Sequence, residues 1–181
     1  IVLDESPFYA EMGGQVGDAG EIVEGERRYA VADTVRLGDV FALRLARADD
    51  PPHTGRVRLR VDAERRRHIE RHHTATHLLH WALREVLGPE LSQKGSSVGP
   101  DRFRFDFNSD ALGAGQLEQV ETLVNLRILE NAPVSWVEVP YEEVRARGDV
   151  LQFFGDKYGG SVRVVQIGGR ARALDGFSME L

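Results

Sequence analysis

Five of the six histidines fall in one short segment, residues 68–80. Two pairs within it are spaced four residues apart, His68 with His72 and His73 with His77. On a helix, residues four apart lie on the same face, with Cβ atoms about 5–6 Å from each other. Two imidazoles at that distance suit a tetrahedral zinc ion. The spacing therefore predicts half of a metal site, although it does not choose between the two pairs.

The neighbours of the two pairs differ in charge. Four arginines surround His68 and His72, and they would repel a divalent cation: Arg65, Arg66, Arg67 and Arg71. His73 and His77 instead flank the small, neutral side chains of residues 74–76. We therefore predict that His73 and His77 are the metal ligands. A solvated helix face that carries histidines by chance is the competing interpretation.

A zinc metalloprotease would need the pattern His-Glu-x-x-His, in which the glutamate next to the first histidine is the general base. Here Glu70 stands two residues after His68 and two before His72, so it points to another side of the helix. The sequence does not fit that class of enzyme.

The composition is typical of a globular chain, with 181 residues, 41 % hydrophobic and 29 % charged. There is no apolar run of the roughly 18 residues that a membrane span needs, so no membrane partner is expected. Cysteine is absent, which excludes disulfides and agrees with a cytoplasmic location. The net charge of -6 argues against a protein that wraps nucleic acid by bulk electrostatics, but leaves room for a local basic patch.

The elements that must position the histidines begin with β structure. Residues 31–36, 40–45 and 56–61 alternate apolar and polar side chains as half-buried strands do. Gly38 and Asp39 have hairpin spacing between the first two strands. Residues 1–61 are therefore predicted to form a small antiparallel β-barrel subdomain with a glycine-rich loop.

The hydrophobic period changes at Asp62, which is suited to cap a helix that ends at Gly88. A second helix is predicted over 117–129, and a short third one over 141–147. Five side chains of the second helix are expected to point toward the core: Leu117, Val120, Leu123, Val124 and Ile128. Further strands are predicted at 92–98, 102–107, 134–139, 162–167 and 177–181. The fold class is thus α+β, with residues 62–181 as helices packed on an antiparallel sheet.

At this point the sequence resembles the editing domain of alanyl-tRNA synthetases, within the alanyl/threonyl-tRNA synthetase editing superfamily. The histidine segment R-H-H-T-A-T-H-L-L-H at 71–80 carries the resemblance first. Other similar segments are, in chain order, P-F-Y-A-E-M-G-G-Q-V-G-D at 7–18, S-Q-K-G-S at 92–96, R-F-R-F-D-F at 102–107, F-G-D-K-Y-G at 154–159 and S-M-E-L at 178–181. Met12 departs from the family, where serine is more usual. The resemblance spans almost the whole chain.

The resemblance implies that Zn²⁺ is the cofactor of the intact protein. In that family a Cys-x-x-x-His follows the S-M-E-L segment and supplies the second pair of ligands. The chain has no cysteine and its sequence stops at Leu181. We therefore expect a chain truncated before that half of the metal site, with weak zinc binding and weak hydrolysis on its own.

The resemblance also implies the reaction, hydrolysis of Ser-tRNA(Ala) and Gly-tRNA(Ala). A pocket for alanine rejects serine and glycine by only about 1–3 kcal/mol, so a second hydrolytic site is required. As a hypothesis, Thr76 reads the serine hydroxyl, and Gln93 hydrogen-bonds the substrate. The loop of Gly13, Gly14 and Gln15 is expected to shape the pocket. A helix residue that fills core space, a surface strand residue and a simple glycine turn are the respective alternatives.

The expected partner is the acceptor end of tRNA(Ala), for which the arginine cluster at 65–67 and 71 supplies positive charge. A solvated helix face paired with Glu64 and Glu70 is an equal alternative. An upstream class II, ATP-binding aminoacylation domain and a downstream C-terminal domain are expected in the parent synthetase. Two other functions remain open: a free-standing editing deacylase that acts in trans, and an inactive tRNA-docking module.

Overall fold

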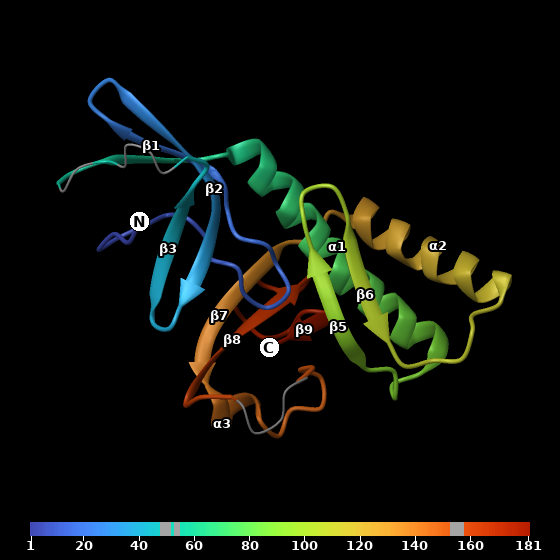
Figure 1. Ribbon diagram of the computed structural model, residues 1–181. Coiled ribbons are helices and arrows are strands. Elements are labelled where there is room, and N and C mark those ends of the chain that lie inside the picture. The colour runs from blue at the N-terminus through green and yellow to red at the C-terminus, as the bar shows by residue number, and fades with distance from the viewer. Residues whose placement is uncertain (48–51, 53–54, 153–157) are drawn as a thin grey trace. The chain divides into compact units, whose positions relative to one another are not determined.

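The computed structural model describes residues 1–47, 52, 55–152 and 158–181, and it has the predicted α+β class (Figure 1). Residues 154–157 of the F-G-D-K-Y-G segment lie outside the described residues. The chain divides into two compact units, which are residues 1–73 with 95–105 and residues 74–94 with 106–181. The predicted functional domains, 1–61 and 62–181, stay a prediction.

The first unit contains a four-stranded sheet in the order β3-β2-β1-β4. Its strands are β1 (Gly20–Glu24), β2 (Arg27–Leu37), β3 (Val40–Leu45) and β4 (Arg58–Val61), and all neighbours are antiparallel. Gly38, with φ +62°, makes the predicted turn between β2 and β3. The core beneath the sheet consists of Phe8, Ile22, Val31 and Leu43.

This sheet is open, because β3 and β4 are its two edges within the described residues. Closure into a barrel, which the sequence predicted, is therefore not confirmed. Strand β1 was not predicted, because the glycine-rich stretch that ends at Gly20 hides the start of a strand whose Ile22 is fully buried.

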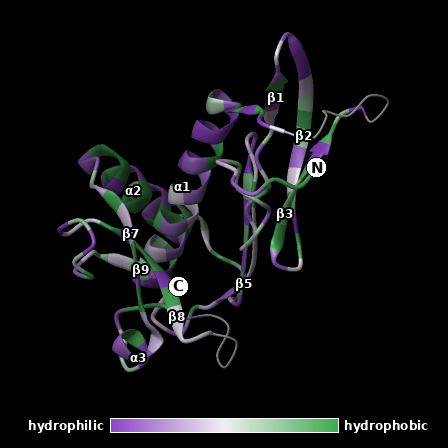
Figure 2. Cartoon of the chain, turned by 90° about the vertical axis from the view of Figure 1, so that its left-hand side faces the viewer, coloured by the Kyte–Doolittle hydropathy of each residue, from purple (hydrophilic) through white to green (hydrophobic). Residues whose placement is uncertain are grey.

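Helix α1 (Ala63–Leu87) belongs to both units in sequence and is the longest element. The backbone N–H of Arg65 donates to Oδ1 of Asp62 at 3.0 Å, so the predicted N-cap is confirmed. Gly88, with φ +106°, follows the last helical residue as predicted. Figure 2 shows that hydrophilic residues dominate the turns of α1.

Strands β5 (Gln93–Val98) and β6 (Phe103–Phe107) form a two-stranded sheet directly after the helix. The second unit adds α2 (Ala114–Glu130), α3 (Tyr141–Val144) and a sheet in the order β7-β8-β9. These strands are β7 (Val134–Pro140), β8 (Ser161–Ile167) and β9 (Ser178–Glu180), paired antiparallel. The predicted strands and helices of this region are thus confirmed, with a shorter third helix.

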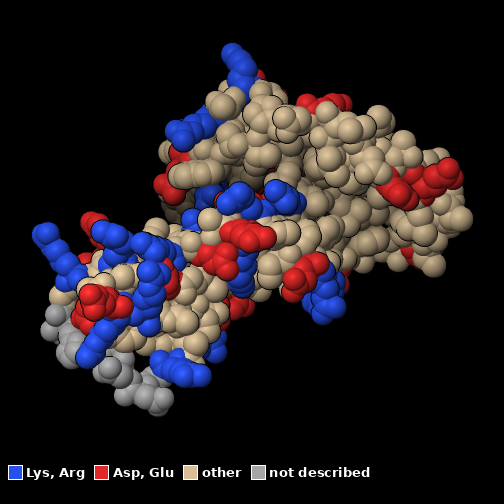
Figure 3. All heavy atoms as spheres, turned by 90° about the horizontal axis from the view of Figure 1, so that it is seen from above, with Lys and Arg blue, Asp and Glu red and all other residues tan. Residues whose placement is uncertain are grey.

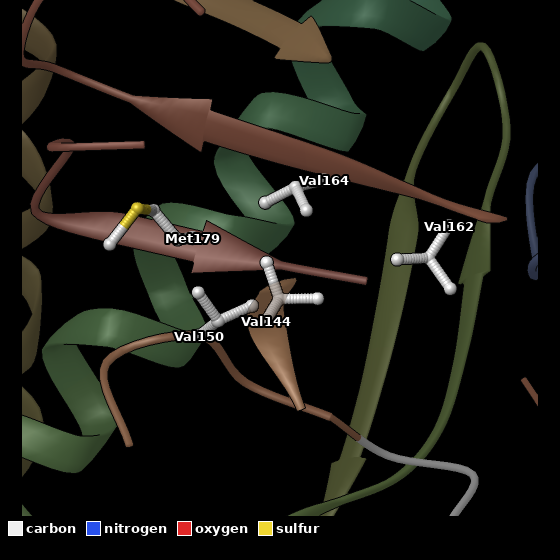
Figure 4. Packing of buried hydrophobic residues seen from close by; sticks show 5 residues of the cluster. All are labelled: Val144, Val150, Val162, Val164 and Met179. Atoms are coloured by element: carbon white, nitrogen blue, oxygen red, sulfur yellow. The ribbon is translucent and has the colours of Figure 1, made fainter. Parts of the chain in front are cut away.

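The second core lies between α3, β8 and β9, where five side chains meet: Val144, Val150, Val162, Val164 and Met179 (Figure 4). Helix α2 contributes Val120 as its buried residue. The predicted inward face of α2 is wrong at Leu117 and Ile128, which are 55 % and 52 % exposed.

Over part of the face shown in Figure 3, basic and acidic side chains lie next to one another. Ion pairs also bring opposite charges together within the first unit, where Glu21 accepts from both Arg28 and Arg60 at 3.1 Å. Among the described residues, no helix is long and apolar enough to cross a bilayer.

Candidate functional site

The glycine-rich loop of the first unit forms backbone hydrogen bonds with strand β5. The N–H of Val16 donates to the carbonyl of Val98 at 3.0 Å, and the N–H of Val98 donates to the carbonyl of Gly14 at 2.8 Å. At Gly14, with φ +81°, a Cβ atom would lie 2.6 Å from the carbonyl oxygen of Ser96. Only glycine fits this close approach without displacing the strand.

The loop places Gln15 against the first predicted metal ligand. Oε1 of Gln15 lies 2.7 Å from Nδ1 of His73. An amide oxygen only accepts, so Nδ1 of His73 donates in this hydrogen bond. Gln15 therefore sets the tautomer of His73 and holds its ring from one side.

In the second unit, His77 also forms a hydrogen bond through Nδ1, but its acceptor is a carboxylate and not an amide. Nδ1 of His77 donates to Oε2 of Glu180 at 2.7 Å. Nδ1 of His80 donates to the other carboxylate oxygen at 2.9 Å. Glu180 and His80 are both buried, with 4 % and 0 % exposure.

The charge of Glu180 is stabilised by these two histidines. Burial by itself raises the pKa of Glu180, but the positive charge of His77 and the hydrogen bonds from His77 and His80 outweigh it and lower the pKa to about 2. The carboxylate is therefore ionised at neutral pH, and it is available as an acceptor for both rings.

Both predicted ligands thus have Nδ1 engaged in a hydrogen bond with an oxygen acceptor. This arrangement, an imidazole whose other ring nitrogen donates to a carboxylate or carbonyl-type oxygen, is usual for histidines that bind zinc. The donor chemistry of His73 and His77 therefore fits zinc. Among the described residues, however, no group of three or more His, Cys, Asp or Glu side chains forms a metal-binding cluster.

The two histidines of the competing pair, His68 and His72, differ in their surroundings. His68 is exposed, whereas Nδ1 of His72 lies 2.7 Å from the carbonyl oxygen of Gly99, and its ring is tilted by 50° against Phe103. His73 and His77 are both half-buried. The choice of His73 and His77 over His68 and His72 stays a prediction.

The predicted substrate-reading residues occupy different elements of the second unit. Thr76 is 6 % exposed and directly precedes His77 on α1. Gln93 is the first residue of β5 and is half-buried. Their roles toward a substrate stay predictions.

The arginine cluster is engaged in contacts within the first unit. Arg65 donates to the carbonyl of Gly17 at 2.8 Å, and Arg67 donates to the carbonyl of Ala63 at 3.1 Å. Arg66 forms an ion pair with the buried Asp18, which also accepts the N–H of Tyr9 at 2.7 Å. The hydrogen bond with Asp18 raises the pKa of Arg66. These contacts fasten the loop to α1, while a role in tRNA binding stays a prediction for these arginines and Arg71.

Sequence reasoning missed His80 and the part that Glu180 plays. His80 follows His77 by three residues, which places both on one helix face, and this spacing was an available signal. The 103-residue separation between His77 and Glu180 gave no local signal, although the S-M-E-L segment belongs to the resemblance.

Comparisons with known proteins show what the chain is similar to. A family model described as tRNA synthetases class II (A) matches residues 1–65. The chain is 51 % identical over 177 residues to an alanine–tRNA ligase of Methylacidiphilum infernorum, with 97 % of the chain and 19 % of the relative covered. It is 52 % identical over 182 residues to the ligase of Akkermansia muciniphila, with 99 % and 19 % covered. The chain therefore spans about a fifth of the length of these relatives.

Proposed function

Because the chain belongs to the alanyl-tRNA synthetase family, we propose that it is an editing region of such an enzyme and hydrolyses Ser-tRNA(Ala) and Gly-tRNA(Ala). Activation of alanine with ATP would belong to other parts of the parent protein. We place this function in the cytoplasm, as a site of translation.

The chemical need for such a site follows from the size of the amino acids. Glycine is smaller than alanine, and serine adds only one hydroxyl, so an alanine pocket excludes neither well. A second pocket that selects by size would also fail, because alanine lies between the two. The editing site must therefore recognise the hydroxyl of serine chemically.

The observation that carries the proposal is the pair of oriented histidines on α1. Nδ1 of His73 is held by Gln15 and Nδ1 of His77 by Glu180, each at 2.7 Å. The two residues are one helical turn apart, and Nε2 of each would be the ligand atom. Fixed rings of this kind are what a hydrolytic metal site requires from the protein.

The histidines would hold zinc, which when bound supplies a Lewis acid for the ester carbonyl and lowers the pKa of water. The chain's own residues would orient the two histidine rings and select the substrate. Gln15 and Glu180 orient the two imidazoles, and the buried Thr76, next to His77 in the sequence, would recognise a serine hydroxyl. Gln93 would hold the substrate from strand β5.

Deacylation of serine-charged tRNA(Ala) by the full-length protein tests this function. We expect His73→Ala and His77→Ala to lower the deacylation rate by about 100-fold while leaving the rate of alanine attachment unchanged. His68→Ala, on the exposed side of the same helix, is the matched control and should behave as wild type. Full deacylation by His73→Ala would contradict the proposal.

A free-standing editing protein and an inactive docking module are separated by two further observations. A parent chain without an aminoacylation domain would identify the free-standing form. Binding of tRNA without any deacylation in the full-length protein would identify the docking module.

A further inference from the structure

Trp136 lies on strand β7, an edge of the three-stranded sheet in the second unit. It is 45 % exposed, and Val134, two residues earlier on the same face of the strand, is 50 % exposed. Large aromatic side chains are usually buried, so an exposed one on a regular strand is an informative exception. This indole face is not used by the proposed hydrolytic site.

Two guanidinium groups lie over the indole ring of Trp136. The Cζ atom of Arg163, from strand β8, is 4.4 Å from the ring centroid, and that of Arg172 is 5.9 Å away. Both distances are within the range of cation–π attraction. We call Trp136, Arg163 and Arg172 the Trp136 platform.

The segment that carries Arg172 is held in a specific conformation. Arg172 has a φ of +62°, which is costly for a residue with a side chain, and its N–H donates to Oγ of Ser135 at 3.0 Å. The fully buried Gln166 donates to the carbonyl of Arg170 at 2.8 Å and accepts the N–H of Leu174 at 2.8 Å. The fold therefore stabilises a strained backbone that brings a second cation to the indole.

We propose that the Trp136 platform binds an unpaired nucleotide of an RNA chain, an inference that rests on the proposed function for its RNA partner. A base has a π face for the indole and the guanidinium planes, and its phosphate complements the two positive charges. An acidic peptide would satisfy only the arginines.

Binding of a labelled single-stranded RNA of about eight nucleotides that ends in ACCA tests the platform in the 181-residue chain. We expect Trp136→Ala to weaken binding about tenfold, and Trp136→Phe, which keeps a ring, to weaken it less. Arg163→Ala and Arg172→Ala should each lower the slope of log affinity against log salt by about one. Arg145→Ala, which also removes an exposed arginine of the second unit, is the control and should leave affinity unchanged.

Tryptophan emission gives a readout that a folding defect does not imitate. The chain has two tryptophans, so Trp81→Phe leaves Trp136 as the reporter, and RNA should quench its emission. Unchanged affinity of Trp136→Ala, an equal loss in Arg145→Ala, or no quenching would overturn the platform. Self-association or protein binding that depends on Trp136, with RNA affinity unchanged, would also overturn it.

This assay separates the two proposals. RNA binding through Trp136 without any deacylation would remove the editing function and keep the platform. Deacylation with RNA affinity that does not depend on Trp136 would keep the editing function and remove the platform.

Discussion

The two histidines proposed as metal ligands are oriented by chemically different groups in the two units. In the first unit, a neutral amide on a glycine-rich loop, Gln15, holds His73. In the second unit, a buried carboxylate, Glu180, holds both His77 and His80. An amide can be removed at little cost to folding, whereas a buried charge network cannot. The comparison predicts that the first contact serves the site and that the second serves the site and the fold together.

The largest effect is expected at Glu180. Glu180→Ala leaves the Nδ1 donors of His77 and His80 buried without their acceptor, which should lower the free energy of unfolding by about 3–5 kcal/mol. Urea denaturation of the 181-residue chain measures this loss. Glu180→Gln keeps the shape and one acceptor oxygen, so a smaller loss is expected. A loss below about 1 kcal/mol in Glu180→Ala would show that the carboxylate does not stabilise the fold.

The free energy of unfolding should also depend on pH because of Glu180. Its pKa is lowered from 4.5 to about 2 in the folded chain, so its contribution is fully present above pH 4.5 and is lost as the pH falls toward 2. The contribution should amount to about 3 kcal/mol. The free energy of unfolding measured at several pH values should fall in this window, and the fall should be smaller in Glu180→Gln. An identical pH dependence in the variant would contradict this assignment.

The next effect concerns the loop that carries Gln15. Gly14→Ala places a Cβ atom 2.6 Å from the carbonyl oxygen of Ser96, at a φ of +81°, and should destabilise the first unit by about 2 kcal/mol. Gly25→Ala is the matched control, because Gly25 also has a positive φ, +60°, but nothing lies within 4 Å of the added atom. Thermal unfolding of the two variants isolates the close approach. Equal melting temperatures would show that the contact with β5 is not tight.

The smallest effect on stability is expected at Gln15 itself. Gln15→Ala removes one neutral acceptor and should change the free energy of unfolding by about 1 kcal/mol or less. Loss of the outer contact of a metal-binding histidine should nevertheless lower deacylation by about tenfold. Parallel measurements of unfolding and of deacylation by the full-length protein test this separation. A stability loss as large as that of Glu180→Ala would remove the distinction between the two units.

Much of the fold followed from local patterns in the sequence. The cap at Asp62, the turn at Gly38 and the strands predicted at 134–139 and 162–167 depend on neighbouring residues, and each was predicted correctly. The inward face of α2 was not, because a periodic helix shows that it is amphipathic but not how much of that face other elements cover. Leu117 and Ile128 are exposed for this reason.

The candidate site was predictable only in part. His73 and His77 were selected by their neutral neighbours, which are local in sequence. Their partners, Gln15 and Glu180, lie 58 and 103 residues away, and no periodicity connects residues at such separations. The same limit applies to Trp136, whose cations come from β8 and from the turn after it.

The most direct test of the central claim is metal binding at His73 and His77, independent of activity. Cobalt(II) added to the metal-free full-length protein reports its ligands through its visible absorption. We predict one bound equivalent in the wild-type protein and in the control His68→Ala, and loss of that absorption in His73→Ala and His77→Ala. An unchanged cobalt spectrum and stoichiometry in these two variants would contradict the assignment of the two histidines as metal ligands.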